Sequence, residues 1–153
     1  MPEAKQHKHP WTIWAFLGLS IVGLFDSILL TLEHFTRRGL PCSLTGGCER
    51  VLTSKWSEIF GIPTAAFGIL FYLVVLYLVI HALTHREALP VKLLLVWGAI
   101  GFMSSVWLVG LQAFVIRAWC QYCLLSALSS TLIFVTAIVH WRGSEFIKLE
   151  VKK

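Results

Sequence analysis

Four long apolar blocks limit what this chain of 153 residues can fold into. They run over residues 11–32, 62–83, 91–116 and 120–141. Each is near or above the roughly 20 residues that a helix needs to cross the hydrocarbon layer of a membrane. We therefore expect an all-α integral membrane protein, built as a bundle of four transmembrane helices.

Composition agrees with a lipid environment and with a single domain. Hydrophobic residues make up 57% of the chain and charged residues only 14%, which is typical of membrane proteins. No repeat, low-complexity tract or long linker divides residues 1–153, so we expect one membrane domain, with the first block as an uncleaved anchor. The net charge of +5 is scattered over helix ends, which argues against nucleic-acid binding.

The basic residues indicate an orientation. Eight of the 13 Lys and Arg residues flank the helix ends that include the termini, and five flank the opposite ends. The positive-inside rule then predicts that both termini are cytoplasmic. All four cysteines would lie on the outer face, where disulfides can form.

The segment between the first two blocks, residues 33–61, is expected to form a lid over the outer end of the bundle. Within it, apolar residues recur at helical spacing from Glu49 to Phe60, which predicts a short amphipathic helix on the membrane surface. Gly61 would end this helix. Pro63 would stand in the first turn of the second span, where proline is tolerated.

Two cysteine pairs carry the candidate chemistry. Cys120-Gln-Tyr-Cys123 opens the fourth block, and the start of a helix stabilises a thiolate. Cys42 and Cys48 lie in the lid loop, where a disulfide between them would close a very short loop and stabilise the fold little. Four cysteines allow three pairings. A mobile pair facing a fixed pair is what thiol–disulfide exchange requires.

The presence of two cysteine pairs, one mobile and one fixed, predicts an electron relay. An external dithiol would deliver electrons to one loop cysteine, the other would attack a CxxC disulfide, and the reduced CxxC would need a final acceptor. At the mouth of a membrane bundle, that acceptor is most naturally a lipid-soluble quinone. Two alternatives are inert disulfide staples and a four-sulfur zinc site. The five residues between Cys42 and Cys48 disagree with the two to four usual between zinc ligands, so we predict no metal.

Further polar and aromatic residues lie within the apolar blocks. Gln112 could donate a hydrogen bond to the quinone, or it could serve as an interhelical contact. Phe67 and Phe71, one turn apart, could line an apolar quinone slot, although such stripes usually form core. Asp26 lies inside the first span, where an ionisable residue suggests either a function or a contact that holds the helices in register.

The cysteine pattern and its surroundings resemble a known family. The run from Cys42 through Gly46-Gly47-Cys48-Glu-Arg to Ser54-Lys-Trp56-Ser is followed by Gly61-Ile-Pro, Phe67-Gly68 and the later Cys120-Gln-Tyr-Cys123. This pattern resembles the vitamin K epoxide reductase family over residues 11–141, and most closely its bacterial members that serve disulfide formation.

The resemblance implies a role for each cysteine. Cys42 would exchange with a thioredoxin-like periplasmic protein, Cys48 would attack Cys120, and the Cys123 thiolate would face ubiquinone or menaquinone. Ser54 matches a serine of the family's loop helix and joins the cysteines as a predicted catalytic residue. At the predicted quinone site, Thr64 stands where the animal enzymes carry asparagine, and Ala127 where they carry tyrosine. Both differences count against epoxide reduction and leave quinone reduction intact.

We therefore expect an enzyme of the bacterial inner membrane that oxidises a thioredoxin-like partner, reduces quinone and so supports disulfide formation. Three alternatives remain: an animal-type epoxide reductase, a non-enzymatic scaffold braced by disulfides, and an unrelated class of disulfide-forming oxidases. In that last class the CxxC comes in the first outer loop, whereas here it comes last. In the fully oxidised protein we predict a Cys120–Cys123 disulfide, and a Cys48–Cys120 link would mark a trapped intermediate.

Overall fold

The computed structural model describes residues 10–36, 41–42, 46–85 and 89–151. Four of its helical segments are long and apolar enough to cross a membrane: Trp11–Thr36, Thr64–Thr84, Val91–Ile116 and Gln121–Gly143. The predicted four-helix membrane bundle is confirmed, and the chain is a multi-pass membrane protein. In order, the elements are α1 (Pro10–Thr36), α2 (Cys48–Leu52), β1 (Glu58–Ile59), β2 (Ile62–Pro63), α3 (Thr64–Thr84), α4 (Val91–Gly110), the π-helical turn η1 (Leu111–Ile116) and α5 (Gln121–Val151).

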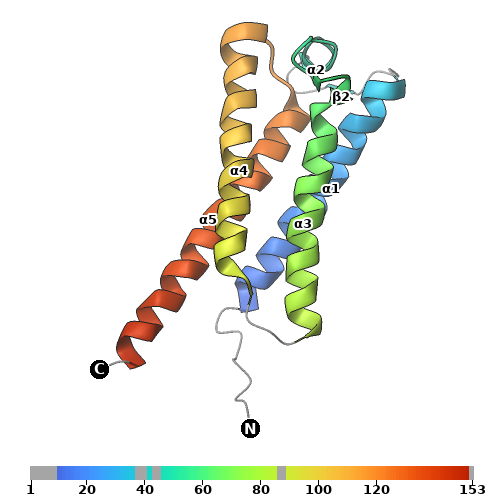
Figure 1. Ribbon diagram of the computed structural model, residues 1–153. Coiled ribbons are helices and arrows are strands. Elements are labelled where there is room, and N and C mark those ends of the chain that lie inside the picture. Colours follow the sequence, from blue (N-terminus) through green and yellow to red (C-terminus); the bar gives the residue numbers. More distant parts are fainter. Residues whose placement is uncertain (1–9, 37–40, 43–45, 86–88, 152–153) are drawn as a thin grey trace.

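The four long helices run up and down, so that α1 begins and α5 ends at the same end of the bundle (Figure 1). The small elements α2, β1 and β2 gather at the opposite end, across the helix ends. We call residues 41–42 and 46–63 the lid, and this end of the bundle the lid end. As the short link between the third and fourth spans predicts, α4 and α5 pack as antiparallel neighbours.

The bundle core is built from one face of each helix. On α1, buried residues recur every three or four positions at Ile13, Phe16, Ser20, Gly23, Ser27 and Leu30, the stripe of a helix with one packed face. The largest buried side chains around Phe16 come from all the other spanning helices: Tyr72, Val75 and Val79 on α3, Leu94 on α4, and Ile133 on α5. The outward faces of these helices remain apolar because they face lipid.

One glycine fixes the distance between α1 and α3. A Cβ atom on Gly23 would overlap the ring of Tyr72, so a glycine is required where this large side chain crosses α1. The Tyr72 hydroxyl reaches α5, where it donates to the Ser126 carbonyl oxygen at 2.8 Å and lies 2.8 Å from the Ser129 hydroxyl. This single side chain therefore links three helices near the middle of the bundle.

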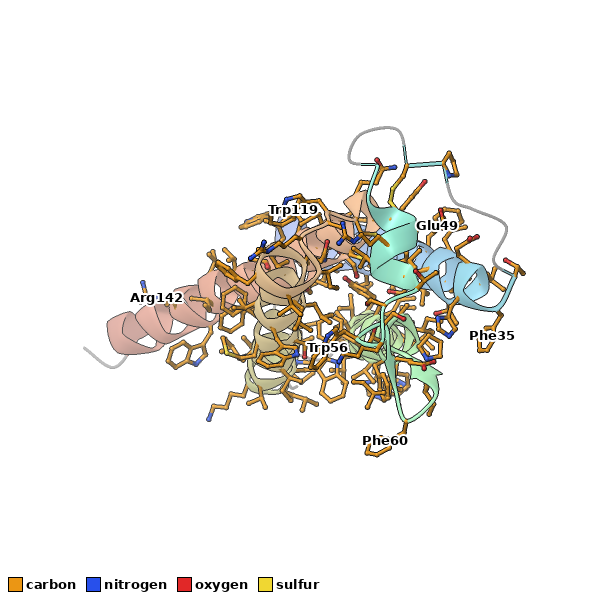
Figure 2. All side chains as sticks on the ribbon, turned by 90° about the horizontal axis from the view of Figure 1, so that it is seen from above. Phe35, Glu49, Trp56, Phe60, Trp119 and Arg142 are labelled. Carbon is orange, nitrogen blue, oxygen red and sulfur yellow. A yellow bond between two sulfur atoms is a disulfide. The ribbon has the colours of Figure 1, made fainter. Side chains whose placement is uncertain are left out.

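The lid differs from its prediction. The helix α2 spans only Cys48–Leu52, and the expected surface helix of residues 49–60 is wrong beyond that point. Instead, Glu58–Ile59 pairs antiparallel with Ile62–Pro63. Phe60 and Gly61 join the strands with positive φ values of 53° and 78°, the backbone of a two-residue hairpin turn. Seen from above the lid end, Phe60 projects outward at the hairpin tip, while Trp56 lies over the bundle (Figure 2).

The boundaries of two spans also shift. The second span begins at Thr64 because residues 62–63 belong to β2, and Pro63 precedes the helix instead of entering its first turn. The first span continues to Thr36, which brings the end of α1 up beside the lid. His34 near this end lies 3.6 Å from the Glu58 carboxylate (Nε2 to Oε2), which ties α1 to the hairpin.

Candidate active site

All four cysteines meet at the lid end. Cys48 and Cys120 are fully buried in one cluster with Leu30, Val51 and Ala118, and Cys42 and Cys123 pack against it while remaining partly accessible. Cys42 and Cys48 form a disulfide with 6.0 Å between their Cα atoms, whereas Cys120 and Cys123 are free thiols. The structure thus holds an oxidised loop pair beside a reduced CxxC. It contains neither the predicted Cys120–Cys123 disulfide nor a Cys48–Cys120 link.

Direct contacts hold the cysteine loop against the start of α5. The Pro41 carbonyl oxygen accepts hydrogen bonds from the Tyr122 hydroxyl at 3.2 Å and from Gln121 Nε2 at 3.3 Å. On the other side of the disulfide, a Cβ on Gly47 would lie only 2.8 Å from the Trp119 carbonyl oxygen. Since glycine alone permits this approach, Gly47 allows its neighbour Cys48 to reach Cys120.

The turn before the CxxC is built around Gln112. At the end of η1, Arg117 takes a left-handed conformation with a φ of 53°, and the Ala118 N–H donates to the Gln112 carbonyl oxygen at 3.2 Å. The Cys120 N–H then donates to the side-chain Oε1 of Gln112 at 2.9 Å. Gln112 is 2% exposed, so it fixes the CxxC backbone from inside the protein. Single π-helical turns of this kind frequently occur at functional sites.

Cys120 stands immediately before α5 and caps it. Its carbonyl oxygen accepts from the Leu124 N–H at 3.0 Å, and its sulfur accepts from the Cys123 N–H at 3.4 Å, as capping side chains do. The hydrogen bond from the Cys123 side chain is the largest influence that lowers the pKa of the Cys120 thiol, and backbone N–H groups add to it against the opposing effect of burial. The predicted thiolate at the helix start is therefore favoured at Cys120.

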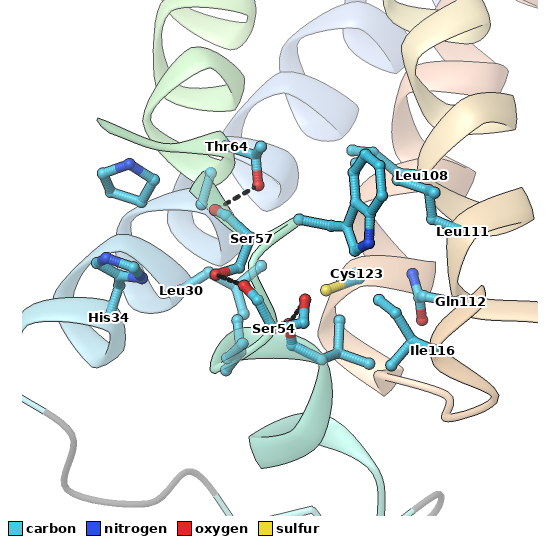
Figure 3. Close-up of a pocket in the computed structure, with 15 residues that line it drawn as sticks. Leu30, His34, Ser54, Ser57, Thr64, Leu108, Leu111, Gln112, Ile116 and Cys123 are labelled. Carbon is cyan, nitrogen blue, oxygen red and sulfur yellow. Dashed lines mark hydrogen bonds between the residues drawn. The ribbon is translucent and has the colours of Figure 1, made fainter. Parts of the chain in front are cut away.

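A pocket opens beside Cys123, between the lid and the ends of the helices (Figure 3). The space between its walls amounts to about 500 Å³ when the open mouth is counted, and only a small part of that space is enclosed. Four predicted site residues line it: Cys123, Gln112, Ser54 and Thr64. The hydroxyls of the last two support the lid, because Ser54 donates to the Val51 carbonyl oxygen at 2.8 Å and Thr64 to that of Ser57 at 3.0 Å.

The predicted aromatic slot of Phe67 and Phe71 is not part of this pocket. Phe67 is 47% exposed on the outer face of α3. Phe71 is buried in the core, stacked against Trp97 with ring centroids 6.2 Å apart. The structure does not bring the two rings to this pocket, because a spacing of one helical turn does not show which neighbour a helix face meets. The aromatic residue of the pocket is Trp56, from the lid.

Several pocket residues were not predicted as site residues from the sequence. Leu108, Leu111 and Ile116 line the pocket from α4 and η1, and Leu30 and His34 line it from α1. The spacing of Leu108, Gln112 and Ile116 by four residues each could have indicated a shared face with Gln112. His34 and Trp56 could not have been found in this way, because their positions depend on the path of the lid.

Spanning helices, a disulfide in a lid and a reduced CxxC at a mostly apolar pocket together define a membrane thiol oxidoreductase. The model of the Vitamin K epoxide reductase family matches residues 14–138 of this chain. The chain belongs to that family, as the cysteine pattern predicted. It is accordingly a redox enzyme of a family that exchanges electrons between thiols, disulfides and quinones in a membrane.

Proposed function

We propose that this enzyme oxidises a thioredoxin-like protein and passes its electrons through Cys42 and Cys48, then Cys120 and Cys123, to a membrane quinone. The single observation that carries the proposal is the position of Cys123, which lines the pocket while its partner Cys120 is buried beside Cys48. Electrons that reach the CxxC from the lid therefore have one exit, through the sulfur that faces the pocket.

The accessibility of the cysteines supports the order of the relay. Cys42 is partly accessible, whereas Cys48 and Cys120 are 1% and 0% exposed. A protein partner reaches Cys42 far more readily than Cys48, and an exchange between Cys48 and Cys120 is sheltered from other thiols. A loop disulfide beside free CxxC thiols is the combination that the proposed relay passes through once electrons have reached the CxxC.

Gln112 supports quinone binding at the pocket. Because its Oε1 accepts the Cys120 N–H, the group that Gln112 can offer to a quinone carbonyl is its Nε2 amide, a hydrogen-bond donor. Trp56 from the lid and Leu108 and Leu111 from the bundle supply apolar surface for the ring. Ser54, predicted as a catalytic residue, and Thr64, predicted as a quinone-binding residue, would then act by holding the lid residues that cover this ring.

The compartment supports the direction of electron flow. With cytoplasmic termini, as the basic residues predict, the cysteines face the oxidising outer side of a bacterial inner membrane. A quinone pool that removes electrons there favours making disulfides over breaking them. The enzyme would then recharge a thioredoxin-like oxidant of that compartment.

The test compares two electron donors with two variants. We expect Cys42→Ser to lose quinone reduction with a reduced thioredoxin-like protein, but to keep it with a small dithiol that reaches the CxxC directly. Cys123→Ser should lose turnover with both donors. Full turnover of Cys42→Ser with the protein donor would refute the proposed entry point, and turnover of Cys123→Ser would refute the proposed exit.

A further inference from the structure

Asp26 is a buried carboxyl group that the relay described above does not use. It lies on the packed face of α1 and is 2% exposed. Neither of its oxygens has a hydrogen-bond partner among the described residues, and the same holds for the hydroxyls of Ser20 and Ser27 on this helix. A buried polar group without a partner is costly and is usually explained by a function or a bound group.

Asp26 lies between two features of the site along α1. One helical turn further along α1, Leu30 packs in the cluster that contains Cys48 and Cys120. One turn earlier, Gly23 receives the ring of Tyr72. On the packed face of α1, Asp26 therefore lies between the CxxC cluster and Tyr72, close enough to interact electrostatically with Cys120, Cys123 and Tyr72.

Among the residues that the structure describes, the groups around Asp26 leave its charge uncompensated. From α3 it faces Tyr72, whose hydroxyl is already bonded to α5. From the start of α5 it faces Cys120 and Cys123, and the nearby Cys48 is held in a disulfide and does not titrate. On α4, Ser105 is bonded to Ser130 of α5 at 2.7 Å. His34, near the end of α1, is paired with Glu58.

These neighbours restrict the number of charges that the site can hold. In a medium of low dielectric, two negative charges close together strongly disfavour each other. A carboxylate at Asp26 and a thiolate at the CxxC therefore compete. Forming the thiolate becomes easier when Asp26 takes up a proton, and a thiol of the CxxC can supply that proton.

We propose, building on the relay above, that Asp26 is the proton acceptor of the CxxC pair. As the pair becomes a thiolate, its first proton moves to the Asp26 carboxylate. Closure of the Cys120–Cys123 bond then delivers two electrons to the quinone, through the sulfur at the pocket. The two thiols give up two protons, one of which Asp26 holds for a time. The two hydroquinone oxygens take up two protons, so the protons balance. The carboxylate is restored for the next cycle.

The test is the pH dependence of a single turnover, in which the reduced enzyme is mixed with quinone and no dithiol. In the wild type, wherever Asp26 starts the reaction ionised, internal transfer to it makes the rate vary little, by less than about threefold per pH unit. In Asp26→Asn, which keeps the size but cannot accept a proton, the thiol must release its proton to water. Its rate should then fall by up to about tenfold for each pH unit on the acid side. Asp26→Glu should restore the flat profile.

A spectroscopic measurement on the wild type keeps the inference testable if Asp26→Asn fails to fold. Infrared difference spectra between the oxidised and reduced CxxC should show the carbonyl band of a protonated carboxyl gained or lost with the redox state. Isotope-labelled aspartate would assign that band. A spectrum without a redox-linked aspartate band would overturn the proposal, as would a parallel pH profile in wild type and Asp26→Asn. Failure of the reduced wild type to reduce any quinone would count against the proposed function instead.

Discussion

The side-chain oxygen of Gln112 accepts a hydrogen bond from the backbone N–H of Cys120 at 2.9 Å, while the same residue lines the pocket that Cys123 faces. One buried side chain thus connects the geometry of the CxxC to the predicted quinone site. Substitutions of Gln112 can therefore separate its support of the Cys120 backbone from its predicted contact with the quinone.

Replacing Gln112 by methionine should destabilise the protein and slow quinone reduction. The buried Cys120 N–H would lose its partner, which typically costs about 1–3 kcal/mol. Gln112→Glu keeps an oxygen acceptor for this N–H but replaces the amide donor by a carboxyl group, so we expect a smaller loss of stability than in Gln112→Met, with a raised KM for quinone. Unfolding in detergent and steady-state kinetics measure the two effects. Equal losses of stability in both variants would contradict the separate roles.

Substitution of Gly47 should uncouple the lid from the CxxC. In Gly47→Ala the added Cβ would press on the Trp119 backbone and move Cys48 away from Cys120. We expect the transfer of electrons from the loop pair to the CxxC, followed by rapid acid quenching and thiol labelling, to slow at least about tenfold, since small displacements at reacting centres have large effects.

Gly46→Asn is the matched control for this substitution. Gly46 has a positive φ of 63° and open space around it, and asparagine tolerates this conformation better than most residues. Its transfer rate should stay near that of the wild type. If Gly47→Ala transferred electrons as fast as Gly46→Asn, the close approach of Gly47 to the Trp119 backbone would have no importance for the exchange between Cys48 and Cys120.

The contact between Gly23 and Tyr72 predicts a strong effect on stability. Gly23→Ala would place a methyl group inside the Tyr72 ring, and overpacking of this kind typically costs about 1–3 kcal/mol. Gly18→Ala adds the same methyl on α1 where nothing lies within 4 Å. We therefore expect a lower Tm for Gly23→Ala and an unchanged or slightly higher Tm for Gly18→Ala. Equal Tm values would mean that α1 and α3 are not in close contact at Gly23.

The acidity of Cys120 depends on Cys123. The hydrogen bond from Cys123 lowers the pKa of Cys120, so its thiolate persists below the usual thiol pKa of about 8.5 and is lost as pH falls through the lowered value. Stability contributed by the thiolate is lost in the same direction. Titration of the ultraviolet thiolate absorbance should show this transition in the reduced wild type and not in Cys120→Ser.

Two substitutions of Cys123 test the cause of this shift. In Cys123→Ala the donor is gone, and the Cys120 transition should move to higher pH. Cys123→Ser keeps a hydroxyl donor and should retain part of the shift. A transition that stayed in place in Cys123→Ala would show that the helix start alone lowers the pKa.

Much of this architecture could be predicted from the sequence. Membrane spans can be recognised because a lipid-facing helix must be apolar along its whole length. The two cysteine pairs can be recognised because their spacing is visible in the sequence itself. The lid could not be predicted in the same way. From Trp56 to Pro63 the apolar residues fit a helix and a hairpin about equally well over so short a stretch, and the turn uses Phe60-Gly61 instead of the common Asn-Gly.

The candidate site was predictable only in part, for a related physical reason. Gln112 could be proposed because polar residues inside apolar spans are few, and Thr64 because the family resemblance implies a quinone site there. Phe67 and Phe71 do not line this pocket: every face of a membrane helix is apolar, so hydrophobicity does not show which face meets the pocket. Trp56 and His34 reach the site through tertiary contacts of the lid, which no local pattern encodes.

The most direct test of the account is a single stoichiometric reaction between quinone and the reduced CxxC. Protein carrying Cys42→Ser and Cys48→Ser would be fully reduced, freed of dithiol and mixed anaerobically with an excess of quinone. The account predicts close to one hydroquinone formed per protein, a Cys120–Cys123 disulfide in the product, and no reaction after the further change Cys123→Ser. No hydroquinone from a folded, fully reduced protein would contradict the claim that the CxxC passes its electrons to quinone.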